Sequence, residues 1–101
     1  MPARRPSPQT LRVLAALLPR AGDWRHGYDL IGETGLASGT LYPVLMRLAD
    51  QGLLEATWQP PQRPGAPPRH AYRLTQAGVA YALAAIAAAA APRDDPGGVM
   101  A

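Results

Sequence analysis

The chain has 101 residues and a mass of 10.7 kDa, which fits one small domain and excludes a multidomain enzyme. Hydrophobic residues make up 48% of the sequence and charged residues 17%, a balance typical of a globular protein rather than a disordered one. There is no cysteine and there are only two histidines, so we expect no disulfide framework, no metal site and no cofactor.

The formal net charge is +3, and all ten basic residues are arginine. The absence of lysine is attributed to genomic base composition, which also explains the excess of alanine and proline. Positive charge is concentrated in residues 1–20, which contain four arginines and no acid, and in residues 55–74, which contain three arginines and one acid. Guanidinium groups match phosphate oxygens and guanine edges well. Residues 1–6 are predicted to form a basic flexible arm.

Two helices are predicted in the N-terminal third of the chain. Ser7 can cap a helix that begins with Pro8, because proline at the first position loses no hydrogen bond there. Leucines spaced three and four residues apart extend this helix to about Leu18. A loop then leads to a second helix from about Gly27 to Thr34, which ends at the glycine that follows it.

The best-defined predicted element is a third helix, for which Ser38 is the expected N-terminal cap. Its apolar face consists of residues at helical spacing: Leu41, Val44, Leu45 and Leu48. Gly52 is expected to end the helix in a left-handed conformation, which would bring Leu53 against Leu48 in a Schellman motif. Pro43 predicts an irregular start.

A hairpin and a final helix are predicted in the C-terminal half. Residues 55–59 and 70–74 are expected to be strands, because Thr57, Trp58 and Tyr72 favour extended structure. The proline-rich segment 60–68 forms the tip of this hairpin. Thr75 is expected to cap a helix that runs to about Ala91, and residues 92–101 lack periodicity and are predicted to be a disordered tail.

This order of elements predicts a mostly α protein with a small β-hairpin, arranged as a winged helix-turn-helix (α-α-α-β-β-α). We expect residues 7–74 to form a DNA-binding domain, with the wing at about residues 55–74. Residues 75–91 are expected to form a C-terminal dimerisation helix.

Three blocks make the assignment more specific: HGYDLI, GLASGTLYPVLMRLADQGLL and RHAYRLTQAG, which lie within residues 26–78. Gly-Thr-Leu-Tyr-Pro in the third helix, together with Leu74, Thr75 and Gly78, is more than a generic winged helix would supply. In these blocks the chain resembles the PadR family of bacterial transcriptional regulators, in a short form with a single C-terminal dimerisation helix.

The resemblance implies a homodimeric regulator, often a repressor, that binds a pseudo-palindromic operator in double-stranded DNA. The third helix would enter the major groove, and the wing would reach the flanking backbone or minor groove. Many family members are released from DNA by small, often aromatic compounds. The resemblance therefore allows a small hydrophobic or aromatic effector here, but the residues do not decide between a ligand-released and a constitutive regulator. Two departures are visible. The final helix contains no tryptophan, and His70 and Ala71 replace the basic and aromatic residues common in the family.

Six residues are predicted to contact DNA. Four lie in the third helix and two in the wing: Ser38, Thr40, Tyr42 and Arg47, followed by Arg63 and Arg69. Two alternatives stay open from the residues alone. The ring of Tyr42 could pack beneath the wing, and the wing arginines could simply keep the proline-rich loop hydrated.

The final helix carries an apolar stripe with no later element to cover it. A second copy of the chain is the simplest cover, so we predict a homodimer formed by the first and last helices. The predicted contact residues are Leu11, Leu14, Val79, Leu83 and Ile86.

No enzymatic or membrane function is expected. The apolar run 78–91 is shorter than the roughly 20 residues that span a bilayer, and the sequence has neither a secretory signal nor a nucleophile elbow. The expected location is the cytoplasm, in association with the nucleoid when the protein is bound to DNA. The competing hypothesis is a winged helix that binds an acidic or apolar protein partner instead of DNA.

Overall fold

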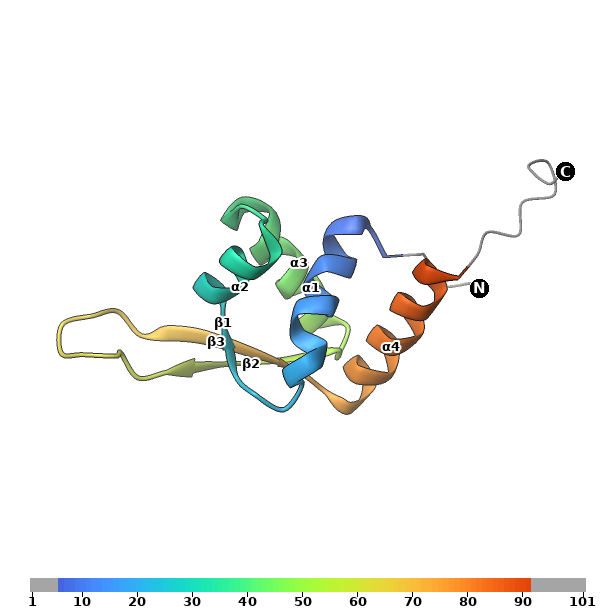
Figure 1. Ribbon diagram of the computed structural model, residues 1–101. Helices are drawn as coiled ribbons and strands as arrows, with labels where there is room; N and C mark the ends of the chain where they lie inside the picture. The colour runs from blue at the N-terminus through green and yellow to red at the C-terminus, as the bar shows by residue number, and fades with distance from the viewer. Residues whose placement is uncertain (1–5, 92–101) are drawn as a thin grey trace, which may run out of the picture.

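The structure is a computed structural model that describes residues 6–91. The expected arm, apart from Pro6, and the expected tail at 92–101 lie outside the described residues. In chain order the elements are α1 (Pro8–Leu17), the 3-10 helix η1 (Leu18–Arg20), β1 (Arg25–His26), α2 (Gly27–Thr34), α3 (Ser38–Asp50), β2 (Leu54–Gln59), β3 (Arg69–Leu74) and α4 (Gln76–Ala90). The hairpin of β2 and β3 projects away from the helices, and α4 lies at the other end of the molecule (Figure 1). The predicted winged helix-turn-helix is confirmed.

Capping hydrogen bonds fix several helix ends where the sequence placed them. At the start of α1, the Ser7 hydroxyl oxygen accepts the amide N–H of Thr10 at 3.1 Å. At the end of α3, Gly52 has a φ of 77°, and the Leu53 amide donates to the Leu48 carbonyl oxygen at 2.9 Å. This is the predicted Schellman motif.

Other helix ends differ from the prediction. Ala37, not Ser38, is the N-cap of α3, because the amides of Thr40 and Leu41 both donate to the Ala37 carbonyl oxygen at 2.9 Å. The first turn therefore closes one residue earlier, and the Ser38 hydroxyl makes no capping bond. Pro43 does not interrupt α3, which is continuous over 13 residues.

The sheet has three antiparallel strands in the order β1-β3-β2, one strand more than the sequence predicted. β2 and β3 pair from Leu54 opposite Leu74 to Gln59 opposite Arg69, so the predicted hairpin is confirmed and each strand is one residue longer. β1 pairs with the other edge of β3 and was expected to be loop. Two residues are too few for any alternation of polar and apolar side chains, so only the pairing defines this strand.

One hydrophobic core joins the helices to the sheet, and the predicted apolar face of α3 forms its centre. The buried residues are Val13, Leu14, Leu17, Leu30, Leu36, Leu41, Val44, Leu45, Leu48, Leu54, Tyr72, Leu74 and Ala82. Leu14 is 0% exposed within the single chain. It has no surface to offer a second copy, which corrects its assignment to a dimer contact.

The start of α4 is attached closely to the turn that follows α3. The Thr75 hydroxyl oxygen accepts the Gly78 amide at 2.9 Å and donates to the Gly52 carbonyl oxygen at 2.8 Å. The Thr75 amide donates to the Leu53 carbonyl oxygen at 3.1 Å. A Cβ atom at Gly78 would overlap that same carbonyl group. Glycine at this position therefore permits the close approach of α4 to the domain.

Candidate nucleic-acid interface

Helix α3 presents an exposed polar face opposite its buried leucines. Ser38, Thr40 and Arg47 all lie on this exposed surface, as a contact with DNA requires. Arg47 forms no ion pair with another residue in the range 6–91. The exposed face of α3 therefore offers hydroxyl donors at its leading end and one guanidinium group near its last turn.

Tyr42 is placed differently from the other three predicted contacts on α3. Its side chain is half-buried and packs against the edge of the core. A Cβ atom at Gly27 would overlap the phenol ring, so the ring lies directly against the first residue of α2. The ring therefore packs against α2, whereas the alternative from the sequence placed it beneath the wing, and only part of the Tyr42 ring remains accessible from outside.

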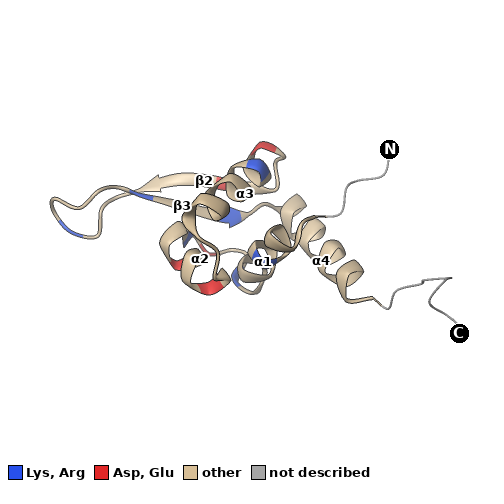
Figure 2. Cartoon of the chain, turned by 90° about the horizontal axis from the view of Figure 1, so that it is seen from above, with Lys and Arg blue, Asp and Glu red and all other residues tan. Residues whose placement is uncertain are grey.

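The wing carries two arginines that form no ion pair among residues 6–91 and could contact a phosphate group, and a third that is already paired with an acid. Arg63 is exposed in the loop and Arg69 is half-exposed at the start of β3, and neither forms an ion pair within the described part of the chain. Arg73 instead pairs with Glu55 across the hairpin at 3.2 Å and covers the ring of Trp24. Figure 2 shows the basic positions along the hairpin and the acidic ones on α2 and at the end of α3.

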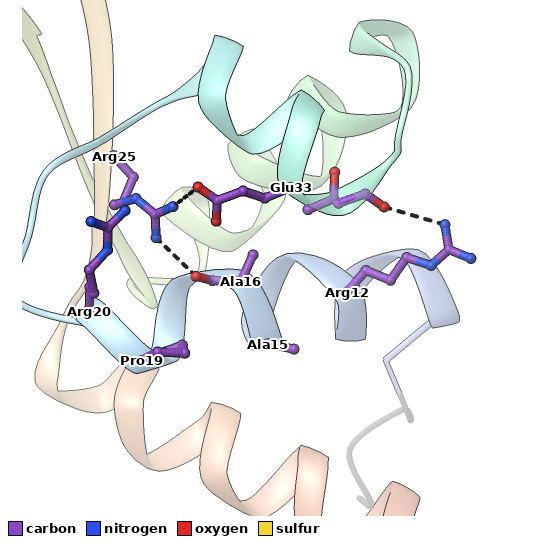
Figure 3. Close-up of a pocket in the computed structure, with 8 residues that line it drawn as sticks. Arg12, Ala15, Ala16, Pro19, Arg20, Arg25 and Glu33 are labelled. Atoms are coloured by element: carbon purple, nitrogen blue, oxygen red, sulfur yellow. Dashed lines mark hydrogen bonds and ion pairs between the residues drawn. The ribbon is translucent and has the colours of Figure 1, made fainter.

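A groove of about 610 Å³ lies between α1 and α2 (Figure 3). Arg25, only 4% exposed, donates to the Ala16 carbonyl oxygen at 2.9 Å and forms an ion pair with Glu33. The exposed Arg12 and Arg20 add positive charge to the rim, beside an apolar wall of alanine and proline. Sequence reasoning missed this groove because it depends on β1, which holds Arg25 in place.

Replacing Glu33 with glutamine is expected to remove an acid-sensitive part of the stability. The hydrogen bond from Arg25 lowers the pKa of Glu33 below its ordinary value of 4.5, although desolvation partly opposes it. A lowered pKa stabilises the folded state above the unfolded pKa, and that stability is lost as the pH falls through the folded value. Thermal melts between about pH 7 and about pH 3 should therefore show a steeper loss of Tm in the parent than in Glu33→Gln. Parallel pH profiles would contradict this role.

The predicted dimer residues lie in different environments. Leu83 is 56% exposed on α4, whereas Val79, Ile86 and Leu11 are half-buried. No charged residue occurs in α4, as Figure 2 shows. Because Leu14 belongs to the core, the remaining candidate dimer surface is the apolar flank of α4, together with Leu11 in the N-terminal half of α1.

Within residues 6–91, no group of histidine, cysteine or acidic side chains is arranged to hold a metal ion. The same part of the chain contains no helix of the length and hydropathy that would cross a membrane.

Comparison with known proteins assigns the fold and the family. The model of the PadR-like family of transcriptional regulators matches residues 16–84. Among curated proteins, no sequence matches the chain significantly.

Solved structures of regulators are similar to the chain. A PadR-like transcription factor from Bacteroides fragilis is 26% identical, with a TM-score of 0.65 over 78% of this chain and 77% of that one. The PcaV transcriptional regulator from Streptomyces coelicolor, solved with its natural ligand, is 26% identical, with a TM-score of 0.66 over 85% of this chain and 59% of that one. A PadR family regulator from Clostridium difficile shares the fold at 21% identity, with a TM-score of 0.63 over 77% of this chain and 84% of that one.

The winged fold, the exposed polar face of α3 and the basic hairpin beside it agree with the family match, which covers more than half of the sequence. The chain belongs to the PadR-like family of transcriptional regulators, which are DNA-binding proteins and not enzymes.

Proposed function

We propose that the protein is a homodimeric repressor that binds a pseudo-palindromic operator through α3 and the wing. The observation that carries this proposal is the combination of an exposed polar face on α3 with a neighbouring wing whose Arg63 and Arg69 form no ion pairs among residues 6–91. Ser38 and Thr40 would enter the major groove first. Arg47 would contact a phosphate or base edge at the groove margin, with part of Tyr42 beside it.

Small-molecule control is the second part of the proposal. The groove between α1 and α2 combines three arginines and one acid with an apolar wall, which suits a small hydrophobic or aromatic acid. The Streptomyces coelicolor regulator was solved with a natural ligand, which supports ligand control in proteins of this fold. The protein would act in the cytoplasm and associate with the nucleoid when bound to its operator.

Arg69→Ala is expected to weaken binding to all DNA sequences alike and to lower the slope of log affinity against log salt by about one unit.

Thr40→Ala is expected to weaken operator binding by about 1–3 kcal/mol while non-specific binding changes little. The operator is first isolated by capture of genomic fragments, and affinities are then measured by fluorescence anisotropy over a series of salt concentrations. Adding a small aromatic acid to the same assay tests release.

The matched control is Arg20→Ala, because Arg20 is an exposed arginine in η1, outside both α3 and the wing. Its salt slope should equal that of the parent. Two results would favour the alternative of a protein-binding winged helix. One is that the protein captures no DNA, and the other is that its affinity for the captured partner does not change with salt concentration.

A further inference from the structure

An aromatic row runs along one face of the hairpin from the core to the exposed part of the wing. Trp58 stacks on His70, its partner in the strand register, with ring centroids 4.3 Å apart and planes within 9°. The ring of Tyr72 follows at 4.8 Å from that of His70. Tyr72 is 3% exposed, whereas Trp58 is 67% exposed. A large apolar ring is therefore presented to solvent at the outer end of a row that is anchored in the core.

The row holds Trp58 in a defined orientation. The Tyr72 hydroxyl oxygen lies 2.9 Å from His70 Nδ1, at hydrogen-bond distance, and burial raises the pKa of this hydroxyl, so it remains protonated at neutral pH. The hydrogen bond fixes the imidazole plane, and that plane supports one face of the indole. Gln59, the residue after Trp58 on β2, is hydrogen-bonded to His26 of β1, with 2.7 Å between Gln59 Oε1 and His26 Nε2. Holding the ring in place before binding reduces the entropy lost when it meets a partner.

The hairpin that carries Trp58 has a basic outer part. Residues 56–91 contain no aspartate or glutamate. Arg63 lies in the loop, and Arg69 pairs with Gln59 one position beyond the stack, so its side chain points to the opposite face of the hairpin from Trp58. Tyr42 of α3 lies near Tyr72, and its phenol group adds to the effect of burial in raising the pKa of Tyr72. The aromatic row thus begins beside the helix that is proposed to enter the major groove and ends on the wing.

We propose that Trp58 is a DNA-contacting residue, whose ring packs on the sugar–phosphate backbone beside the groove occupied by α3. This inference rests on the proposed DNA-binding function. The indole supplies an apolar face for a deoxyribose ring and one N–H donor for a phosphate oxygen. Arg63 and Arg69 supply the charge, and Trp58 supplies a contact that does not depend on charge.

A nucleic acid fits this surface better than a protein partner does. The exposed aromatic surface is one indole on a narrow hairpin, and stable protein interfaces bury about 800 Å² on each partner. The adjacent charge is positive, with no acid from residue 56 to residue 91, and complements phosphate. The groove between α1 and α2 is not lined by Trp58, so the site proposed for a small molecule is separate from this ring.

The first test uses the fluorescence of Trp58. In a Trp24→Phe background, Trp58 is the only tryptophan, and its emission should change on addition of operator DNA, in parallel with anisotropy from labelled DNA. The reciprocal Trp58→Phe protein keeps Trp24, which lies under Arg73, and its emission should change little. Binding of DNA without any change in Trp58 emission would overturn the inference while leaving the proposed function intact.

The second test separates an apolar contact from a charged one. Trp58→Ala should weaken DNA binding roughly tenfold, within the range of a single aromatic stacking contact, and should leave the salt slope unchanged. Trp58→Phe should restore most of the affinity. Melts and sedimentation should match the parent, because the ring is largely exposed.

Three results distinguish the possible failures. Unchanged affinity in Trp58→Ala would refute this contact alone. A change in Trp58 emission that depends on protein concentration without DNA would assign the ring to contact between copies of the chain and would also refute it. Failure of every variant and of the parent to bind DNA would refute the proposed function itself.

Discussion

Replacing Gly78 with alanine is expected to destabilise the domain by about 2–3 kcal/mol and to lower the Tm by roughly 10–20 °C. Alanine favours a helix over glycine by about 1 kcal/mol, so propensity alone predicts the opposite sign. The added methyl group would overlap the Leu53 carbonyl, a backbone group that cannot rotate away. To remove this overlap, α4 would have to move away from the turn that follows α3. The hydrogen bond from the Thr75 hydroxyl to the Gly52 carbonyl oxygen opposes that movement.

Gly32→Ala is the matched control for this prediction. Gly32 also lies within a helix, α2, but nothing comes within 4 Å of the position that its Cβ would occupy. This variant should be more stable than the parent by about 0.5–1 kcal/mol, because only helix propensity changes. Thermal melts followed by circular dichroism measure both effects. If Gly78→Ala were as stable as Gly32→Ala, the close contact between α4 and residue 53 would be wrong.

Leu83→Asp is expected to convert the proposed dimer into a monomer and to weaken operator binding roughly 100-fold or more, because the two half-sites are no longer bound by one linked unit. The fold of the single chain should survive, with a cost within about 1 kcal/mol, because Leu83 is 56% exposed. Sedimentation at micromolar concentration measures the dimer, and anisotropy measures DNA binding.

Ala84→Asp provides the control on the same helix. Adjacent residues lie about 100° apart around an α-helix, so Ala84 is exposed but points away from the apolar flank that contains Leu83. This variant should remain dimeric and bind the operator. A dimeric Leu83→Asp protein, or two monomeric variants, would show that the flank of α4 is not the specific dimer contact.

Part of the fold follows from local signals in the sequence. The hydrophobic period of α3 and its glycine predict both its buried face and its Schellman end, since these depend on residues within one helix and its next two positions. Ser7 and Thr75 were likewise predicted as caps from their immediate neighbours, and both caps are confirmed. The family resemblance came from short blocks in the same elements, and the family match confirms it.

Other features depend on contacts between residues far apart in the chain. Arg25 is buried because β1 pairs with β3, nearly fifty positions later, and because Glu33 neutralises its charge. Leu14 and Leu11 look alike in the helical pattern, yet Leu14 faces the core and Leu11 its margin.

Trp58 illustrates the same division between local pattern and tertiary structure. The strand that contains Trp58 was predicted from the sequence. The stacking of Trp58 on His70 was not, because it depends on how β2 and β3 pair across a long loop. The sequence by itself determined the four α-helices, the hairpin, the winged fold and the family, because hydrophobic period, caps and turn residues act over a few positions. Only the tertiary structure decided strand β1, the burial of Arg25 beside Glu33 and the stacking of Trp58 on His70, because these depend on which distant segments pack beside them.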